Sequence, residues 1–233
     1  DAQESRGLGD VYKRQGLLSP HIVPKSAICD PELTLDLPPL LTAATGMDAI
    51  THCCETFMSS ALNFPAEGIA LDGLWRGWRH IERATKTPHD REARFHMMSA
   101  STQGAMAFQK GLGAVHSLSH SLGGINPKLH HGTLNAMFLP AVILFNASEA
   151  SMQKGKKLER LAETMGLPGP VDVAPSIKAL NQRLGLPSGL AAMGVTPEMF
   201  PKIIEGAMAD HCHKTNPRTP TPDDYAALLK QSM

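Results

Sequence analysis

The chain has 233 residues, 42% hydrophobic and 19% charged, a composition typical of a globular protein with a buried core. Its 22 basic and 22 acidic residues cancel, which excludes the basic surface expected of proteins that bind nucleic acid or anionic membranes. No apolar run reaches the roughly 20 residues of a membrane span, and the four cysteines contain no CxxC pair. With no signal-peptide pattern at the amino terminus, we expect a cytoplasmic protein.

The first residues differ from the rest in character. Residues 1–15 are polar and lack periodicity, so we expect a non-native or disordered flank there and one helical metal-binding domain over residues 16–233. Within that domain, residues 25–30 form a short apolar run closed by Pro31, which predicts a single strand.

From Pro38 onward the apolar residues follow helical spacing. A glycine pair, Gly123-Gly124, is expected to end the fourth helix. The sequence therefore predicts a mainly α fold, with helices over residues 40–60, 65–84, 90–109, 112–122, 131–146, 154–165, 174–184, 196–210 and 221–231.

Two helical pairs carry metal-binding side chains. Asp48 and His52 are four residues apart, as are His116 and His120, so each pair projects from one helix face. Carboxylate oxygen and imidazole nitrogen suit Fe(II), Zn(II) or Mn(II). One such pair occurs often by chance, but two pairs in glycine-punctuated apolar helices indicate a metal site.

These segments resemble a known family. GMDAITHCCETF at 46–57, GAVHSLSHSLGG at 113–124 and HHGTLNAMFLP at 130–140 are similar to the signature segments of the iron-dependent (group III) alcohol dehydrogenases. The resemblance implies that Asp48, His52, His116 and His131 are the metal ligands. Because the loop before it is one residue longer than in most of the family, His130 is the alternative fourth ligand. His131 is preferred since it directly precedes Gly132.

The resemblance also implies how the cofactor and substrate are handled. His120 would lie beside the nicotinamide of NAD or NADP and relay a proton, so we expect it to be catalytic. Leu33, Thr34 and Leu37, together with His120 and His131, would contact the cofactor. The implied reaction is reversible hydride transfer between NAD(P) and a small alcohol or hydroxy acid at Fe(II) or Zn(II), in a homo-oligomeric full-length enzyme.

A nucleotide-binding domain is missing from the pattern. The family carries a preceding α/β dinucleotide-binding domain, yet this chain has neither its glycine-rich turn nor a βα alternation. We therefore expect the carboxyl-terminal helical half of a dehydroquinate synthase-like fold, without appreciable dehydrogenase activity by itself. The alternatives are a zinc enzyme like glycerol dehydrogenase or dehydroquinate synthase, a metal-dependent hydrolase, or an inactive metal-binding fragment.

One further motif lies near the carboxyl end. His211 and His213 flank Cys212, a trio that can bind metal, although a role in lining or supporting the cleft near Asn216-Pro217-Arg218 is preferred.

Overall fold

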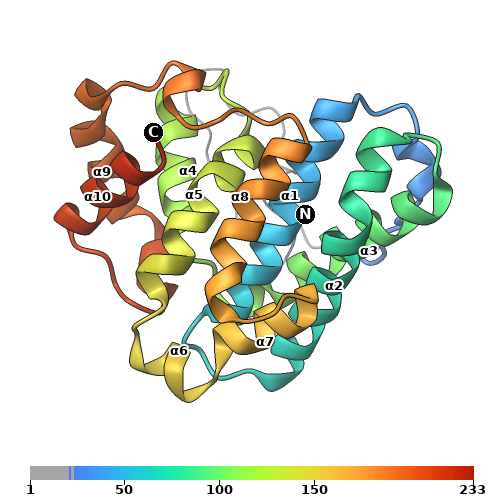
Figure 1. The fold of residues 1–233 in the computed structure, drawn as a ribbon, viewed down its shortest axis with the longest axis horizontal. Coiled ribbons are helices and arrows are strands. Elements are labelled where there is room, and N and C mark those ends of the chain that lie inside the picture. The colour runs from blue at the N-terminus through green and yellow to red at the C-terminus, as the bar shows by residue number, and fades with distance from the viewer. Residues whose placement is uncertain (1–20, 22–23) are drawn as a thin grey trace.

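The computed structural model describes His21 and residues 24–233, and over these residues it is built of helices without strands (Figure 1). The mainly α prediction is confirmed. The longer helices are α1 (Pro39–Met58), α2 (Phe64–Lys86), α3 (Arg91–Ala107), α4 (Ala114–Ile125), α5 (His131–Asn146), α7 (Lys157–Met165), α8 (Val173–Arg183), α9 (Phe200–Ala209) and α10 (Pro222–Gln231). The shorter ones are α6 (Ala150–Lys154) and the 3-10 turns η2 (Pro31–Thr34), η3 (Phe108–Lys110), η4 (Pro170–Asp172), η5 (Ala191–Met193), η6 (Pro197–Met199) and η7 (His211–Thr215).

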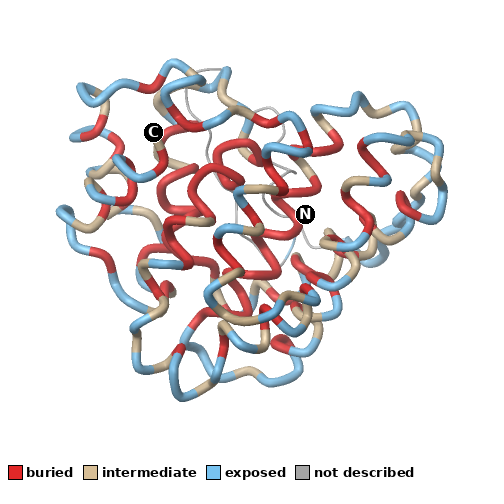
Figure 2. Tube along the Cα trace, in the orientation of Figure 1, coloured by how far each residue is buried: buried red, intermediate tan, exposed pale blue. Residues whose placement is uncertain are grey.

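Helix α1 is the central element. It is buried from Gly46 to Met58 on all its faces, as expected of a helix that is apolar around its circumference. Helices α2, α3 and α5 pack against it, α4 and α8 pack on α5, and α9 packs on α4. In Figure 1, α2 and α3 lie on one side of the central helices and α9 and α10 on the other. The buried trace in Figure 2 is concentrated in those central helices.

Glycines allow α2 and α3 to approach α1 closely. A Cβ atom at Gly77 would lie 2.9 Å from the Ile50 side chain, and one at Gly104 would lie 2.9 Å from His52 Cβ. Such distances are shorter than real Cβ contacts, so a larger residue would push the helices apart. The backbone that carries His52 is thereby held by neighbours on two sides.

Two buried lysines donate hydrogen bonds to carbonyls at the carboxyl end of α1. Lys157 Nζ donates to the carbonyl oxygens of Phe57, Met58 and Ser59 at 3.0, 2.9 and 2.7 Å. Lys110 Nζ donates to Ser59 O at 2.8 Å and to Glu67 Oε1 at 3.0 Å. The last turn of a helix has carbonyls without helical partners, and a cation there also interacts favourably with the helix dipole.

Replacement of Lys157 by Met is expected to destabilise the fold by about 2–4 kcal/mol, because the carbonyls of Phe57 and Met58 lose their lysine donor and Glu67 loses a nearby cation. The free energy of unfolding in urea measures this. Lys202→Met, at an exposed position, is the control and is expected to change stability by less than about 0.5 kcal/mol. Equal stability of the two variants would show that the lysine does not fasten α1.

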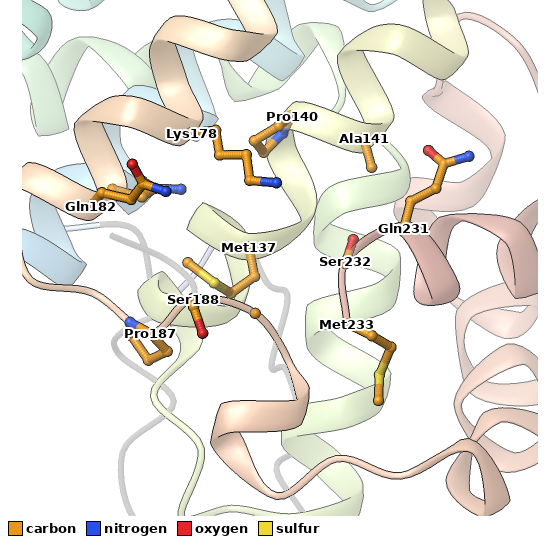
Figure 3. Close-up of a pocket in the computed structure, with 12 residues that line it drawn as sticks. Met137, Pro140, Ala141, Lys178, Gln182, Pro187, Ser188, Gln231, Ser232 and Met233 are labelled. Atoms are coloured by element: carbon orange, nitrogen blue, oxygen red, sulfur yellow. The ribbon is translucent and has the colours of Figure 1, made fainter.

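Helix α5 contains a proline, and the neighbouring helix α8 supplies the hydrogen bond that this proline removes. Pro140 has no amide hydrogen, so the carbonyl of Ala136 one turn earlier has no helical donor. Asn181 of α8 donates its Nδ2 hydrogen to that carbonyl at 2.7 Å. Pro140, Lys178 and Gln182 also line a cavity of about 100 Å³ beside α5 and α8, which residues 187–189 and 231–233 complete (Figure 3).

Two local predictions are wrong, and one lies outside the described residues. Residues 25–30 form no strand, because they are exposed and no partner strand is available in the described part of the chain. Gly123-Gly124 does not end α4, which continues to Ile125 and is closed by Asn126 in an extended conformation. The flank predicted at residues 1–15 lies outside what the structure describes. None of the helices formed by the described residues is both long and apolar enough to cross a bilayer.

Candidate metal centre

Four side chains from three helices converge at the centre of the bundle. Asp48 and His52 come from adjacent turns of α1, His116 from the first turn of α4, and His131 from the first residue of α5. The Nε2 atoms of the three histidines lie 3.6, 3.7 and 3.6 Å from Asp48 Oδ1, in chain order. The structure thus brings together all four residues predicted as ligands.

The cluster has the spacing and chemistry of a cation site. Two ligands bound about 2.1 Å from a tetrahedral metal lie roughly 3.4 Å apart, close to the spacings between these atoms. His52 Nε2 is buried and has no hydrogen-bond partner. An unpartnered buried nitrogen is costly in a folded protein, and a cation bound between the four groups would satisfy it. One oxygen and three nitrogen donors therefore fit Fe(II) or Zn(II).

The adjacent residues His130 and His131 differ in burial and in their distance from the cluster. His131 is half-buried and reaches the cluster, with its Nε2 atom 3.6 Å from Asp48 Oδ1. His130 is exposed and precedes the first turn of α5 as the cap residue. The placement before Gly132 thus selects the histidine that faces Asp48.

Burial and mutual contact set the charges of the cluster. Burial lowers the pKa of His52 and of His131 to about 3 each, although Asp48 opposes the shift, so both imidazoles are neutral. Burial alone would raise the pKa of Asp48, but the attraction of the surrounding histidines outweighs it and holds the pKa below its ordinary value. His116 is also desolvated, yet its contacts with Asp48 and Glu55 raise its pKa to about 9.

Glu55 supports the cluster from one turn further along α1. Its Oε2 atom lies 2.5 Å from His116 Nδ1, and its Oε1 accepts the Val115 backbone N–H at 2.8 Å. Metal-binding histidines commonly donate their second ring nitrogen to a carboxylate, which fixes the ring so that the other nitrogen faces the metal. Glu55 thus directs His116 Nε2 toward Asp48.

Asn135 lies one helical turn after His131 and closes the cluster. Its Nδ2 atom is 2.6 Å from Asp48 Oδ1, 3.0 Å from His131 Nε2 and 3.2 Å from His116 Nε2. Its Oδ1 atom is buried and has no hydrogen-bond partner. The amide group therefore contacts the same atoms that would surround a cation, and its orientation is coupled to them.

His120 is held beside this cluster by an acidic residue from a distant segment. Its Nδ1 atom lies 2.9 Å from Asp210 Oδ2, and its ring stacks on that of His131 with the centroids 5.4 Å apart. Burial would raise the pKa of Asp210, but the hydrogen bonds from His120 and the Cys212 backbone amide and the attraction of the nearby histidines together outweigh it and lower the pKa to about 2. Asp210 is therefore ionised and accepts the Nδ1 hydrogen of His120.

The segment that contains Asp210 continues through η7 to a residue that caps the start of α4. Asn216, just beyond η7, accepts the Ala114 backbone N–H with its Oδ1 at 3.0 Å. The cap residue of α4 is Gly113, which has no side chain to do so. Asn216 also exchanges two hydrogen bonds with Asn146 of α5, at 3.2 and 2.7 Å. The polar side chain from the Asn-Pro-Arg segment thus joins the helices that carry His116 and His131.

The remaining residues predicted to contact the cofactor lie on the segment that leads into α1. Leu33 is 84% exposed on η2, while Thr34 and Leu37 are half-buried. Thr34 Oγ1 donates to Pro31 O at 2.7 Å, and η2 packs on α3, where Glu32 pairs with Arg91. Their role in binding a nucleotide stays a prediction.

The helical fold and this cluster of ligands are those of a metal-binding domain, and comparison with known proteins identifies its family. Residues 42–233 match the model of the Fe-containing alcohol dehydrogenase family, C-terminal, and the chain belongs to this family.

Its relatives are dehydrogenases. The chain is 59% identical over 228 residues to a 4-hydroxybutyrate dehydrogenase of Cupriavidus necator, covering 96% of the chain and 60% of that protein. It is 35% identical to an NAD-dependent methanol dehydrogenase of Bacillus methanolicus, covering 91% of the chain and 57% of that protein. It superposes on the iron-containing alcohol dehydrogenase of Thermococcus thioreducens with a TM-score of 0.82 at 28% identity, covering 93% and 56% of the two chains. The chain thus spans less than two thirds of the length of these relatives.

Proposed function

We propose that Asp48, His52, His116 and His131 bind a divalent iron ion. We further propose that the enzyme to which this chain belongs transfers hydride reversibly between an alcohol or hydroxy acid and NAD(P). The observation that carries the proposal is the buried, unpartnered His52 Nε2 in a cluster of one oxygen and three nitrogen donors. Family membership supports iron, although Zn(II) accepts the same donors and can compete when it is abundant.

The metal, when bound, would polarise the substrate oxygen and lower the pKa of an alcohol, and the nicotinamide would accept the hydride. The chain's own residues would then handle the proton. Because ionised Asp210 accepts the Nδ1 hydrogen, Nε2 is the nitrogen of His120 that would exchange the substrate proton. The stacked ring of His131 holds His120 next to the ligand cluster, where it can take up the alcohol proton directly or through water.

We propose a short hydroxy acid as the substrate class, since a protein 59% identical to this chain is named 4-hydroxybutyrate dehydrogenase. We test the proposal with a fusion in which the amino-terminal part of that relative precedes residues 24–233. The fusion, loaded anaerobically with Fe(II), is expected to reduce NAD on addition of 4-hydroxybutyrate, whereas the same fusion with His116→Ala is not. A metal-loaded, folded fusion without NADH formation from 4-hydroxybutyrate, 1,3-propanediol or methanol would contradict the proposed function.

Replacement of Glu55 by Gln is expected to weaken metal binding about 10–100-fold, because His116 loses the charged acceptor that orients its ring. Calorimetric titration of the metal-free chain with Zn(II) measures the change. Glu163→Gln, which removes the same charge at an exposed position of α7, is the control and is expected to leave the affinity unchanged. Equal affinities for both variants would refute the supporting role of Glu55.

A further inference from the structure

A second group of metal-binding side chains lies beside the first. His120 of α4 meets Asp210, His211 and Cys212 at the start of η7, and one possible ligand atom from each lies within 4.8 Å of the others. The four residues include a thiol, which the first cluster lacks. The proposed proton transfer involves His120 and Asp210, whereas His211 and Cys212 have no role in it.

The structure divides the His-Cys-His motif in an unexpected way. His213 points away from the group, and its Nδ1 atom lies 3.0 Å from the hydroxyl of Tyr225 on α10. Its place is taken by His120, which precedes Asp210 by 90 residues in the sequence. The motif therefore contributes only His211 and Cys212 to the group. The other two donors, His120 and Asp210, lie outside the motif.

The donor groups are already paired with one another. His211 Nε2 lies 3.4 Å from Cys212 Sγ, and His120 Nδ1 lies 2.9 Å from Asp210 Oδ2. Asp210 Oδ1 accepts the Cys212 backbone N–H at 2.8 Å, which holds its carboxylate in place. The Cys212 residue is 1% exposed, whereas the His211 side chain is 69% exposed and can adjust its rotamer. Three donors are thus preorganised, and the fourth belongs to an exposed side chain with room to change rotamer.

We infer that His120, Asp210, His211 and Cys212 form a second cation site that is selective for Zn(II). Thiolate, imidazole and carboxylate together are a zinc donor set, and they are softer than the one oxygen and three nitrogens of the first cluster. Tetrahedral zinc would require its donors to lie about 3.3–3.8 Å apart, so the longest separations must contract. The exposed His211 side chain has room to make this adjustment.

Zinc binding at this site requires proton release but no redox step. The Cys212 thiol loses its proton to solvent, and the thiolate and the Asp210 carboxylate together neutralise the two positive charges of zinc. The hydrogen of the His120 nitrogen that binds zinc moves through solvent to the other ring nitrogen, so the imidazole binds as a neutral ligand. Zinc bound here would take His120 from its hydrogen bond with Asp210, so the second site and proton transfer by His120 would exclude each other.

Cobalt(II) provides a direct test, because thiolate coordination to Co(II) gives a charge-transfer absorption that oxygen and nitrogen ligands do not. The reduced, metal-free chain is titrated with Co(II), and the bound metal is counted by equilibrium dialysis with Zn(II). We expect two equivalents of zinc and a thiolate band for the unchanged chain. Cys212→Ser is expected to abolish the band and to bind one equivalent fewer. His211→Ala, at an exposed position where folding is not at risk, is expected to lose the same equivalent.

Two control variants separate this site from other sources of the signal. Cys29→Ser removes an exposed thiol and is expected to keep both the band and the stoichiometry. His116→Ala, in the first cluster, is expected to keep the band while losing the other equivalent. A band that persists in Cys212→Ser, or a single zinc equivalent that neither Cys212→Ser nor His211→Ala removes, would overturn the second site. Neither result would bear on the iron site.

Discussion

Replacement of His116 by Ala is expected to leave the chain unable to retain iron through dialysis. His116 Nε2 lies 3.7 Å from Asp48 Oδ1, and its ring stacks on that of His52 with the centroids 4.6 Å apart, so its removal opens the ligand cluster on one side. It also leaves Glu55 buried without its histidine partner, which costs several kcal/mol if the carboxylate stays charged. Elemental analysis of the dialysed protein gives the metal content.

A second variant keeps this test decisive if His116→Ala folds poorly. His131 is half-buried and its acidic partner is Asp48, so His131→Ala is expected to fold and still lose the metal. His89→Ala changes an exposed histidine outside the cluster and is expected to retain it. Full metal content in both cluster variants would refute the proposed ligand set.

Replacement of Gly132 by Ala is expected to displace His131 and destabilise the fold by about 2–3 kcal/mol. A Cβ atom at this position would lie 2.1 Å from the Ala44 carbonyl oxygen and 2.8 Å from its carbon. Both contacts are with backbone, so no side chain can rotate aside and α5 must move away from α1. Because Gly132 adjoins His131, that movement separates the ligands on the two helices. Urea unfolding and zinc titration of the same variant measure the two effects.

Gly124→Ala is the matched control. Gly124 is an exposed residue inside α4, and a Cβ atom there would meet nothing within 4 Å. Alanine is the better helix former, so this change is expected to raise stability by up to about 1 kcal/mol and to leave metal binding intact. If Gly132→Ala behaved like this control, the close approach of α5 to α1 would not be needed to place His131.

Sequence spacing predicts those parts of the site that lie on a single helix. Asp48 and His52 are one turn apart on α1, and the same rule would have led to Glu55, which follows Asp48 by seven residues and is again on that face. Asn135 follows His131 by four residues on α5 and could have been found in the same way. Neither was predicted, because a metal-ligand pattern includes only the residues that bind the ion directly.

Residues brought together by tertiary structure could not be found from spacing. Asp210 reaches His120 across 90 residues of sequence, and Asn216 caps α4 across 102. The strand predicted at residues 25–30 failed for a related reason, because an apolar run becomes a strand only beside a partner. Local patterns thus predict helices and pairs of ligands, while the groups that orient those ligands depend on the packing of the helices.

The capping of α4 by Asn216 has a consequence for how the chain folds. The first turn of α4, which carries His116, obtains its backbone partner from a segment that the ribosome adds about 100 residues later. Contacts of such long range form late, since much of the intervening chain must be ordered before they can close. The α1 ligands can be in place early, but the α4 side of the site is completed only when η7 docks. Metal capture would then be one of the last events of folding and would report that the carboxyl-terminal segment has reached its native position.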